Sequence, residues 1–153
     1  MRSISRRGLV VSAAVLAFPA RLSAVPGAAM TLWKSRGCAC CTALAGHFER
    51  AGFAVTVHEV TDLGPARTAA GVPADLAGCH TALVDGYVVE GHVPVADVQR
   101  LLAERPAVLG LAVPGMPAGS PGMEIPGVAA EPIDVMAFAA DGTRTVFRAV
   151  PPG

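Results

Sequence analysis

The sequence has few aromatic residues, few charges and no apolar run long enough to span a membrane. Its 153 residues are 5% aromatic and 16% charged, whereas 52% are hydrophobic. A core can therefore form, and aliphatic side chains must fill most of it. A run of about eighteen apolar residues would indicate a membrane span, and a sustained repeat would indicate a solenoid. Neither occurs, so we expect a single domain with no stable membrane span in the mature chain.

The first 29 residues have the composition of an export signal rather than of a folded domain. Arg6 and Arg7 precede an apolar stretch, Leu9–Phe18, and small residues that provide cleavage sites follow it. Paired arginines predict the twin-arginine route, although "SRRGLV" matches the usual pattern incompletely. The alternative is a buried core helix that happens to begin with two arginines. We expect export to the periplasm and a mature domain that spans residues 30–153.

The mature chain also lacks a basic patch. Four of the twelve basic residues lie in the first 29 positions, whereas all twelve acidic residues lie later. Eight basic groups against twelve acidic groups give residues 30–153 a net charge of −4. Nucleic-acid binding depends on clustered positive charge, so we do not expect this protein to bind nucleic acid.

The order of predicted elements indicates an α/β fold. Short strands alternate with helices of amphipathic spacing, and "DG" at Asp85–Gly86 predicts a β-hairpin turn. This order is typical of a thioredoxin-like sheet with packed helices. The predicted strands cover residues 30–35, 53–60, 81–84 and 87–91, and the predicted helices cover residues 41–51 and the segment from Pro94 to Pro106.

The C-terminal part departs from a thioredoxin-like plan. Residues 112–127 are rich in glycine and proline and contain Met116 and Met123, which predicts an irregular loop. Residues 133–149 then read as a second hairpin that turns at Asp141–Gly142. The chain is therefore expected to be one domain with a C-terminal loop and β-hairpin extension.

Three of the four cysteines are crowded into four positions. Cys38 and Cys41 form a C-x-x-C at the expected start of a helix, where free backbone N–H groups and the helix dipole stabilise thiolates. We expect the pKa values of these two thiols to be lowered. Thiolates attack disulfides and also bind soft metals, so the position alone does not separate the two activities.

Cys40 and Cys79 favour a metal site. A dithiol oxidoreductase needs two sulfur atoms, and Cys40 would invite wrong pairings. In glutaredoxin-like chains a proline faces the C-x-x-C, and here Cys79–His80 takes the corresponding place, so we expect it to face the cluster. Soft thiolates select Cu(I) and Zn(II), and thioethers favour Cu(I) further. The predicted ligands for Cu(I), as one ion or a multinuclear thiolate cluster, are Cys38, Cys40, Cys41, Cys79, His80, Met116 and Met123.

Several alternatives remain open on the residues alone. An exported chain with four cysteines can form two disulfides. Cys38 and Cys41 can serve a thiol-disulfide oxidoreductase, and four cysteines can hold Zn(II) or a [2Fe–2S] cluster. The two methionines can simply pack within their loop. His92 can cap the following helix or support a ligand.

Four motifs together resemble one known family. They are "CACC", "GCHTALVDGYVVEGHVP", "RLLAERPAVLGLAVPGMPAGSPGME" and "IDVMAFAADGT". The combination is similar to the CopG-like periplasmic copper-binding proteins, a thioredoxin-like metal-binding family whose members are often described only as domains of unknown function. The resemblance covers nearly all of residues 30–149. A tryptophan that often follows the cysteine cluster in this family is missing here.

The resemblance implies export, copper binding and a link to copper resistance or handling. It implies ligand roles for Cys38, Cys40, Cys41 and Cys79–His80, and more weakly for the loop with Met116 and Met123. The expected partners are copper ions and other periplasmic copper-handling proteins. We expect a binding protein rather than an enzyme, with redox activity at the copper or dithiol site as the alternative.

Overall fold

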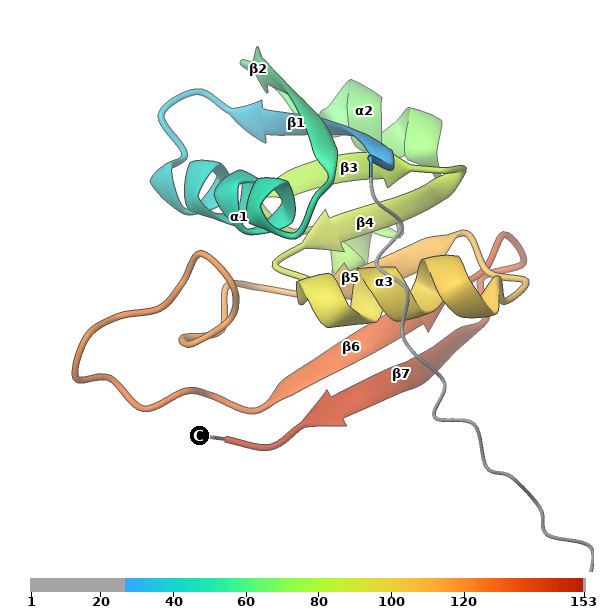
Figure 1. Ribbon diagram of the computed structural model, residues 1–153. Coiled ribbons are helices and arrows are strands. Elements are labelled where there is room, and N and C mark those ends of the chain that lie inside the picture. The colour runs from blue at the N-terminus through green and yellow to red at the C-terminus, as the bar shows by residue number, and fades with distance from the viewer. Residues whose placement is uncertain (1–26, 153) are drawn as a thin grey trace, which may run out of the picture.

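The computed structural model describes residues 27–152 as one mixed α/β sheet with three α-helices (Figure 1). The expected export signal lies almost entirely outside these residues. Within them, no helix is long and apolar enough to cross a bilayer. The elements in chain order are β1 (Ala29–Ser35), α1 (Ala39–Arg50), β2 (Ala54–Val60), α2 (Gly64–Ala70), the 3₁₀ turn η1 (Ala74–Leu76), β3 (His80–Val84), β4 (Tyr87–Gly91), α3 (Val95–Glu104), β5 (Gly110–Val113), β6 (Ile133–Phe138) and β7 (Arg144–Val150).

The seven strands lie in the order β2-β1-β3-β4-β5-β6-β7. β1 and β2 are parallel, as are β4 and β5, and the other neighbours are antiparallel. The hairpin between β3 and β4 turns at Asp85 and Gly86, both with positive φ, as a type I′ turn requires. The predicted fold class, an α/β sheet with packed helices and a C-terminal loop and hairpin, is confirmed.

Two details of the sequence prediction need correction. Residues 110–113 form β5, a buried strand, although residues 112 and 113 were expected in the irregular loop. Four residues are too few for a periodic pattern, and the strand forms because it pairs with β4 and β6. Through β5 the C-terminal hairpin continues the sheet instead of forming an appendage. β2 was expected to be half-buried, but it is mostly exposed because it is an edge strand.

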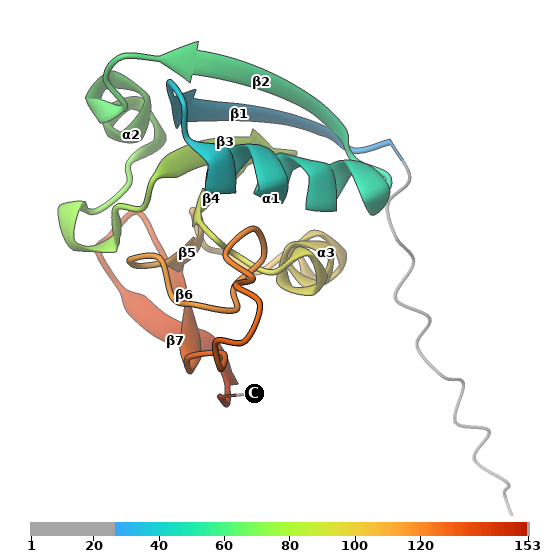
Figure 2. The same ribbon diagram turned by 90° about the vertical axis from the view of Figure 1, so that its left-hand side faces the viewer.

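Helices cover the sheet unequally. α1 and α3 pack on one face, and α2 lies on the other (Figure 2). Leu44 and Phe48 of α1 and Leu101 of α3 are buried in the larger core. Each such side chain contributes about 1.5–3 kcal/mol by burial. α2 has no buried residue of its own, so hydrophobic burial alone does not account for its position.

The ends of β1, β3 and β4 determine where the cysteines lie. β1 leads through a short turn into α1, which places Cys38 at the N-cap of the helix. Cys79 immediately precedes β3, and His92 immediately follows β4. The loop between β5 and β6 lies at the same end of the molecule as the start of α1 (Figure 1). Three separate segments therefore converge at one end of the sheet.

Candidate metal centre

The N-cap and first turn of α1 present three sulfur atoms. The Cys38 Sγ accepts a hydrogen bond from the Cys41 backbone N–H at 3.4 Å, so this side chain caps the helix. The Cys38 and Cys40 Sγ atoms are 3.4 Å apart. Cys41 is fully buried under the helix start, whereas Cys38 and Cys40 are half-buried. The helix begins two residues earlier than predicted because the Cys38 side chain supplies the cap.

Cys38 and Cys41 form a disulfide in this structure. Cys40 and Cys79 are the free thiols. The structure therefore contains one of the two disulfides that an ordinary four-cysteine framework would have. The expected lowering of the Cys38 and Cys41 pKa values applies only to the reduced form.

Cys79, immediately before β3, lies against the cysteines at the start of α1. This is the position facing the C-x-x-C that was predicted for it. Its Sγ is 4.0 Å from the Cys40 Sγ and 3.4 Å from the Cys41 Sγ. The Cys41 Sγ also lies 3.6 Å from the Cys79 carbonyl oxygen. Disulfide-bonded Cys41 has no thiol proton, so its contact with the Cys79 carbonyl oxygen is a packing contact, and between the two sulfur atoms only the Cys79 thiol can donate. The four Sγ atoms all lie within 4.8 Å of one another.

Two histidines lie on the other side of Cys79. The Cys79 Sγ is 3.4 Å from His80 Nδ1 and 3.1 Å from His92 Nε2. The two rings pack edge to face with centroids 5.1 Å apart, and both side chains are fully buried. Cys79, His80 and His92 thus form a second group of possible ligands that shares the Cys79 sulfur with the first.

His92 is the site residue that the sequence analysis did not assign as a ligand. The predicted alternative of a helix cap is wrong, because the N-cap of α3 is Pro94. The register of the β3–β4 hairpin nevertheless indicates that His92 lies near Cys79. The antiparallel register pairs Thr81 with Glu90, and continuing it for two residues places Cys79 opposite His92.

Burial determines the protonation of this second group. Burial, followed by the nearby His92, lowers the pKa of His80 to about 3, although the Gly91 backbone acts in the opposite direction. Burial also lowers the pKa of His92. His92 Nδ1 donates to the Pro121 carbonyl at 2.9 Å, which leaves the Nε2 lone pair directed at Cys79. Both imidazoles are neutral near pH 7, as a metal ligand must be.

The thiol of Cys79 is held in its protonated form when no metal is bound. Burial first, and the neighbouring Cys40 second, raise the pKa of Cys79 to about 12. A positive ion beside the sulfur reverses this preference, because a coordinated thiol is deprotonated. Within residues 27–152, His80 Nε2 has no hydrogen-bond partner of acceptable geometry. Such orphaned polar atoms are rare in folded proteins and call for an explanation.

The loop between β5 and β6 covers the start of α1. A Cβ atom at Gly122 would lie 2.6 Å from the Cys40 carbonyl oxygen, so the two backbones are in close contact. Glu124 Oε1 lies 2.9 Å from His47 Nε2 on α1. Met116 is exposed and lines a small pocket beside Cys79, and Met123 is half-buried next to Gly122. Both predicted methionines therefore lie on the loop that covers the start of α1, and Met116 also borders the pocket beside Cys79.

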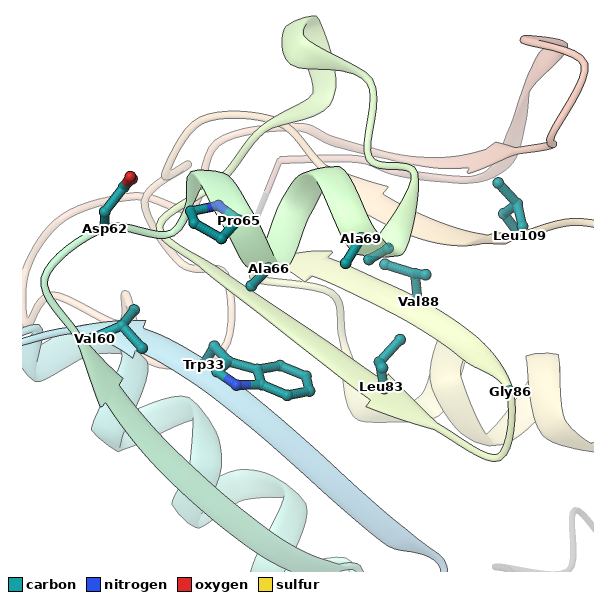
Figure 3. Close-up of a pocket in the computed structure, with 11 residues that line it drawn as sticks. Trp33, Val60, Asp62, Pro65, Ala66, Ala69, Leu83, Gly86, Val88 and Leu109 are labelled. Carbon is teal, nitrogen blue, oxygen red and sulfur yellow. The ribbon is translucent and has the colours of Figure 1, made fainter.

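A cavity larger than the pocket beside Cys79 lies on the face of the sheet that α2 covers, opposite α1 and α3. This groove of about 500 Å³ is between α2 and the sheet, with Trp33, Leu83 and Val88 on its floor (Figure 3). Trp33 also stacks on His58. No residue that lines the groove carries a sulfur atom or an imidazole. The chemistry is therefore concentrated at the cysteines, although the larger space is elsewhere.

Comparisons with known proteins identify relatives of this chain. The family model described as "Protein of unknown function, DUF411" matches residues 76–123. Two solved structures of copper resistance protein copG, forms 1 and 2, are each 38% identical to this chain with a TM-score of 0.77. Each covers 82% of this chain, and the matches span 98% and 99% of the solved chains. A comparison with curated proteins found no match.

Proposed function

This chain belongs to the same family as copper resistance protein copG, and from that premise we propose that it binds Cu(I) in the periplasm for copper handling or resistance. The observation that supports the proposal most is the convergence of four sulfur atoms from two distant segments. Copper is the cargo of this site. The proposed ligands are Cys38, Cys40, Cys41, Cys79 and His80, with Met116 and Met123 as closing thioethers, and we now add His92.

The kind of donor favours Cu(I) over harder ions. The two groups of donors contain thiolates and neutral imidazoles, and neither contains a carboxylate. Soft sulfur ligands select Cu(I) and Zn(II) among the divalent and monovalent ions that proteins bind. Because Cys79 contacts both groups, it can bridge two ions, which supports a multinuclear cluster. The His80 nitrogen that lies 3.4 Å from the Cys79 Sγ is Nδ1, so Nδ1 is the atom placed to share an ion with this thiol.

Reduction must precede full occupancy of the site. In the oxidised form the Cys38 and Cys41 sulfurs are joined to each other and cannot act as thiolates. An external dithiol supplies the two electrons and two protons that convert this disulfide into two thiols, and is itself oxidised to a disulfide. Copper binding then releases the thiol protons, including that of Cys79.

Elemental analysis with a free-thiol count tests the proposal. Protein purified without oxidation is expected to contain copper and no stoichiometric zinc. Cys40→Ser and Cys79→Ser are expected to reduce the bound copper sharply. Thr42→Ser, beside the cluster but exposed, is a matched control that keeps the wild-type copper content. Copper contents that are equal in all four proteins would contradict the ligand set.

The disulfide between Cys38 and Cys41 favours a second candidate function, a thiol-disulfide oxidoreductase. In that reaction one thiolate of the reduced pair attacks a substrate disulfide, and its partner resolves the mixed disulfide. The substrate leaves as a dithiol and the pair becomes oxidised. This function predicts that Cys40→Ser keeps disulfide reductase activity and that Cys38→Ser abolishes it. Copper binding predicts that both variants lose copper.

We also propose that residues 1–29 direct export, by the twin-arginine route. The replacement of both Arg6 and Arg7 with lysine is expected to retain the protein in the cytoplasm. Cell fractionation measures this outcome directly. Export that continues unchanged in this variant would instead indicate the general secretory route.

A further inference from the structure

Glu90 of β4 is a fully buried carboxylate outside the proposed ligand set. Its Oε1 lies 3.0 Å from Arg67 Nε and accepts a hydrogen bond from the Gly78 N–H at 2.7 Å. Its Oε2 accepts from the Thr81 hydroxyl at 2.7 Å. A buried charge is costly unless it is paired and hydrogen-bonded, and here both oxygens have partners. A single carboxylate thus connects α2, the segment before β3, and β3 itself.

Arg67 completes the arrangement from α2. Besides its ion pair with Glu90, its guanidinium donates to the Gly78 carbonyl oxygen. Both backbone polar groups of Gly78 are therefore held by the Arg67–Glu90 pair. A Cβ atom at Gly78 would lie 2.6 Å from the Gly91 Cα, so the two backbones are also in direct contact. This contact leaves no space for a side chain at position 78.

The held groups flank the candidate metal centre in the chain. Gly78 immediately precedes Cys79, Thr81 immediately follows His80, and Glu90 lies two residues before His92. The pair therefore fixes the backbone on both sides of Cys79–His80 and ties it to the strand that leads to His92. At this place the Cys79 Sγ and His92 Nε2 are 3.1 Å apart.

We propose that the Arg67–Glu90 pair is a positioning device that sets the location of the Cys79 sulfur relative to the Cys38–Cys41 turn and to His92. The effect of this pair on copper affinity rests on the proposed function. Its effect on the position of Cys79 rests on geometry alone. It also accounts for the position of α2, which has no buried residue to anchor it. Ligands that are held in place by neighbouring groups bind metal about 10–100-fold more tightly than ligands without such support.

A second buried ion pair provides the matched control. Asp97 of α3 is almost fully buried and is held by Arg148 of β7 through two hydrogen bonds of 2.6 Å. This pair has the same chemistry as Arg67–Glu90, but within residues 27–152 neither of its hydrogen bonds involves a proposed ligand. If the Arg67–Glu90 pair only stabilises the fold, variants of the two pairs should therefore have the same effect on the metal centre.

The first experiment uses the oxidised, metal-free full-length protein, in which Cys40 and Cys79 are the free thiols. Alkylation by iodoacetamide is followed by mass spectrometry, with Cys40 as the internal reference. Arg67→Met is expected to speed the alkylation of Cys79 relative to Cys40, and Asp97→Asn is expected to leave this ratio unchanged. An unchanged ratio in Arg67→Met, or an equal change in Asp97→Asn, would overturn the proposal.

The second experiment measures the Cu(I) affinity of the reduced proteins by competition with a chromophoric chelator. Arg67→Met and Glu90→Ala are expected to weaken binding by about tenfold or more. Glu90→Gln is expected to recover most of the affinity, because its amide oxygen can still accept from the Gly78 N–H. Asp97→Asn should bind copper like the wild type despite a lower Tm. Equal affinities in all these variants would overturn the positioning role.

The two experiments distinguish a failure of the proposed copper function from a failure of the positioning role. A wild-type protein that binds no copper would refute the proposed function, yet the Cys79 alkylation ratio would still test the Arg67–Glu90 pair. If Glu90→Ala does not fold, Arg67→Met supplies the same test, because Arg67 is partly exposed and its replacement keeps the aliphatic stem.

Discussion

The Cys38–Cys41 turn and the Cys79–His80 segment supply ligands to the same place by different physical means. The turn is local, because a helix start concentrates three cysteines within four residues and caps itself with Cys38. The second segment depends on long-range topology, since a β-hairpin brings His92 opposite Cys79. The first group is partly exposed, and the second contains two fully buried imidazoles. Three of the four sulfur atoms thus come from one helix start, whereas the position of Cys79 and His92 depends on the pairing of β3 with β4.

Cys79→Ser should have the largest effect, because Cys79 is the one residue that contacts both groups. We expect the Cu(I) affinity to fall by more than the roughly 10–100-fold that is typical of losing a supporting group. Chelator competition measures this change, and circular dichroism confirms that the variant is folded. If the variant retained wild-type affinity, the two segments would not share the metal.

His92→Gln should have an intermediate effect. The substitution removes the Nε2 lone pair that faces Cys79 and weakens Cu(I) binding by about tenfold. His47→Gln is the control, since His47 contacts Glu124 on the surface of the loop and lies outside both groups of donors. Equal affinities for the two histidine variants would remove His92 from the site.

Gly122→Ala should separate the covering loop from the cysteine turn. The new Cβ atom would meet the Cys40 carbonyl and the Leu44 backbone nitrogen at 2.6 and 2.9 Å. Gly127→Ala is the control, because Gly127 also has a positive φ but has open space around it. Both variants carry about 1–2 kcal/mol of backbone strain, and only Gly122→Ala adds a steric clash.

Urea unfolding and hydrogen exchange distinguish these two glycine variants. Gly122→Ala should unfold at lower urea and show faster exchange in residues 115–124 than Gly127→Ala. Identical exchange in the two proteins would show that the loop does not depend on its contact with α1.

The smallest effect is the pH dependence of stability near neutral pH. Because burial lowers the pKa of His80 to about 3, the unfolded chain binds a proton at this residue before the folded protein does. The metal-free protein should therefore lose stability as the pH falls from about 6.5 toward 3, with a contribution of at most about 1.4 kcal/mol per pH unit. Between pH 7 and 6 the change is below about 1 kcal/mol.

His80→Gln tests the origin of this pH dependence. The groups that face His80 are Cys79, His92 and Arg67, and His92 contributes in the same direction. Urea titrations between pH 7 and 4 should give a shallower loss of stability for the variant than for the wild type. Parallel curves would assign the acid sensitivity to other groups.

The local half of the site was more predictable than the long-range half. The hairpin at Asp85–Gly86 and a helix that opens at the cysteines follow from short-range patterns. The structure confirms both, although the helix begins two residues earlier than predicted. The position of Cys79 facing the turn was also predicted, from its place relative to glutaredoxin-like chains. The arrangement of sulfur atoms was thus accessible without coordinates.

Three features could not be read from local patterns. His92 becomes a neighbour of Cys79 only when the hairpin register is extended beyond the ends of the strands. β5 is too short for a periodic signal and is stabilised by two neighbouring strands. The Arg67–Glu90 pair joins residues 23 positions apart, and only the folded sheet shows that it holds Gly78.

Differential alkylation during a Cu(I) titration tests the central claim most directly. The reduced wild-type protein receives increasing Cu(I), and each cysteine is then scored for modification by mass spectrometry. If one site is shared, Cys79 becomes protected together with Cys38, Cys40 and Cys41 at the same copper-to-protein ratio. If Cys79 remained reactive while the other three became protected, the two segments would not bind a common metal, and the account would be wrong.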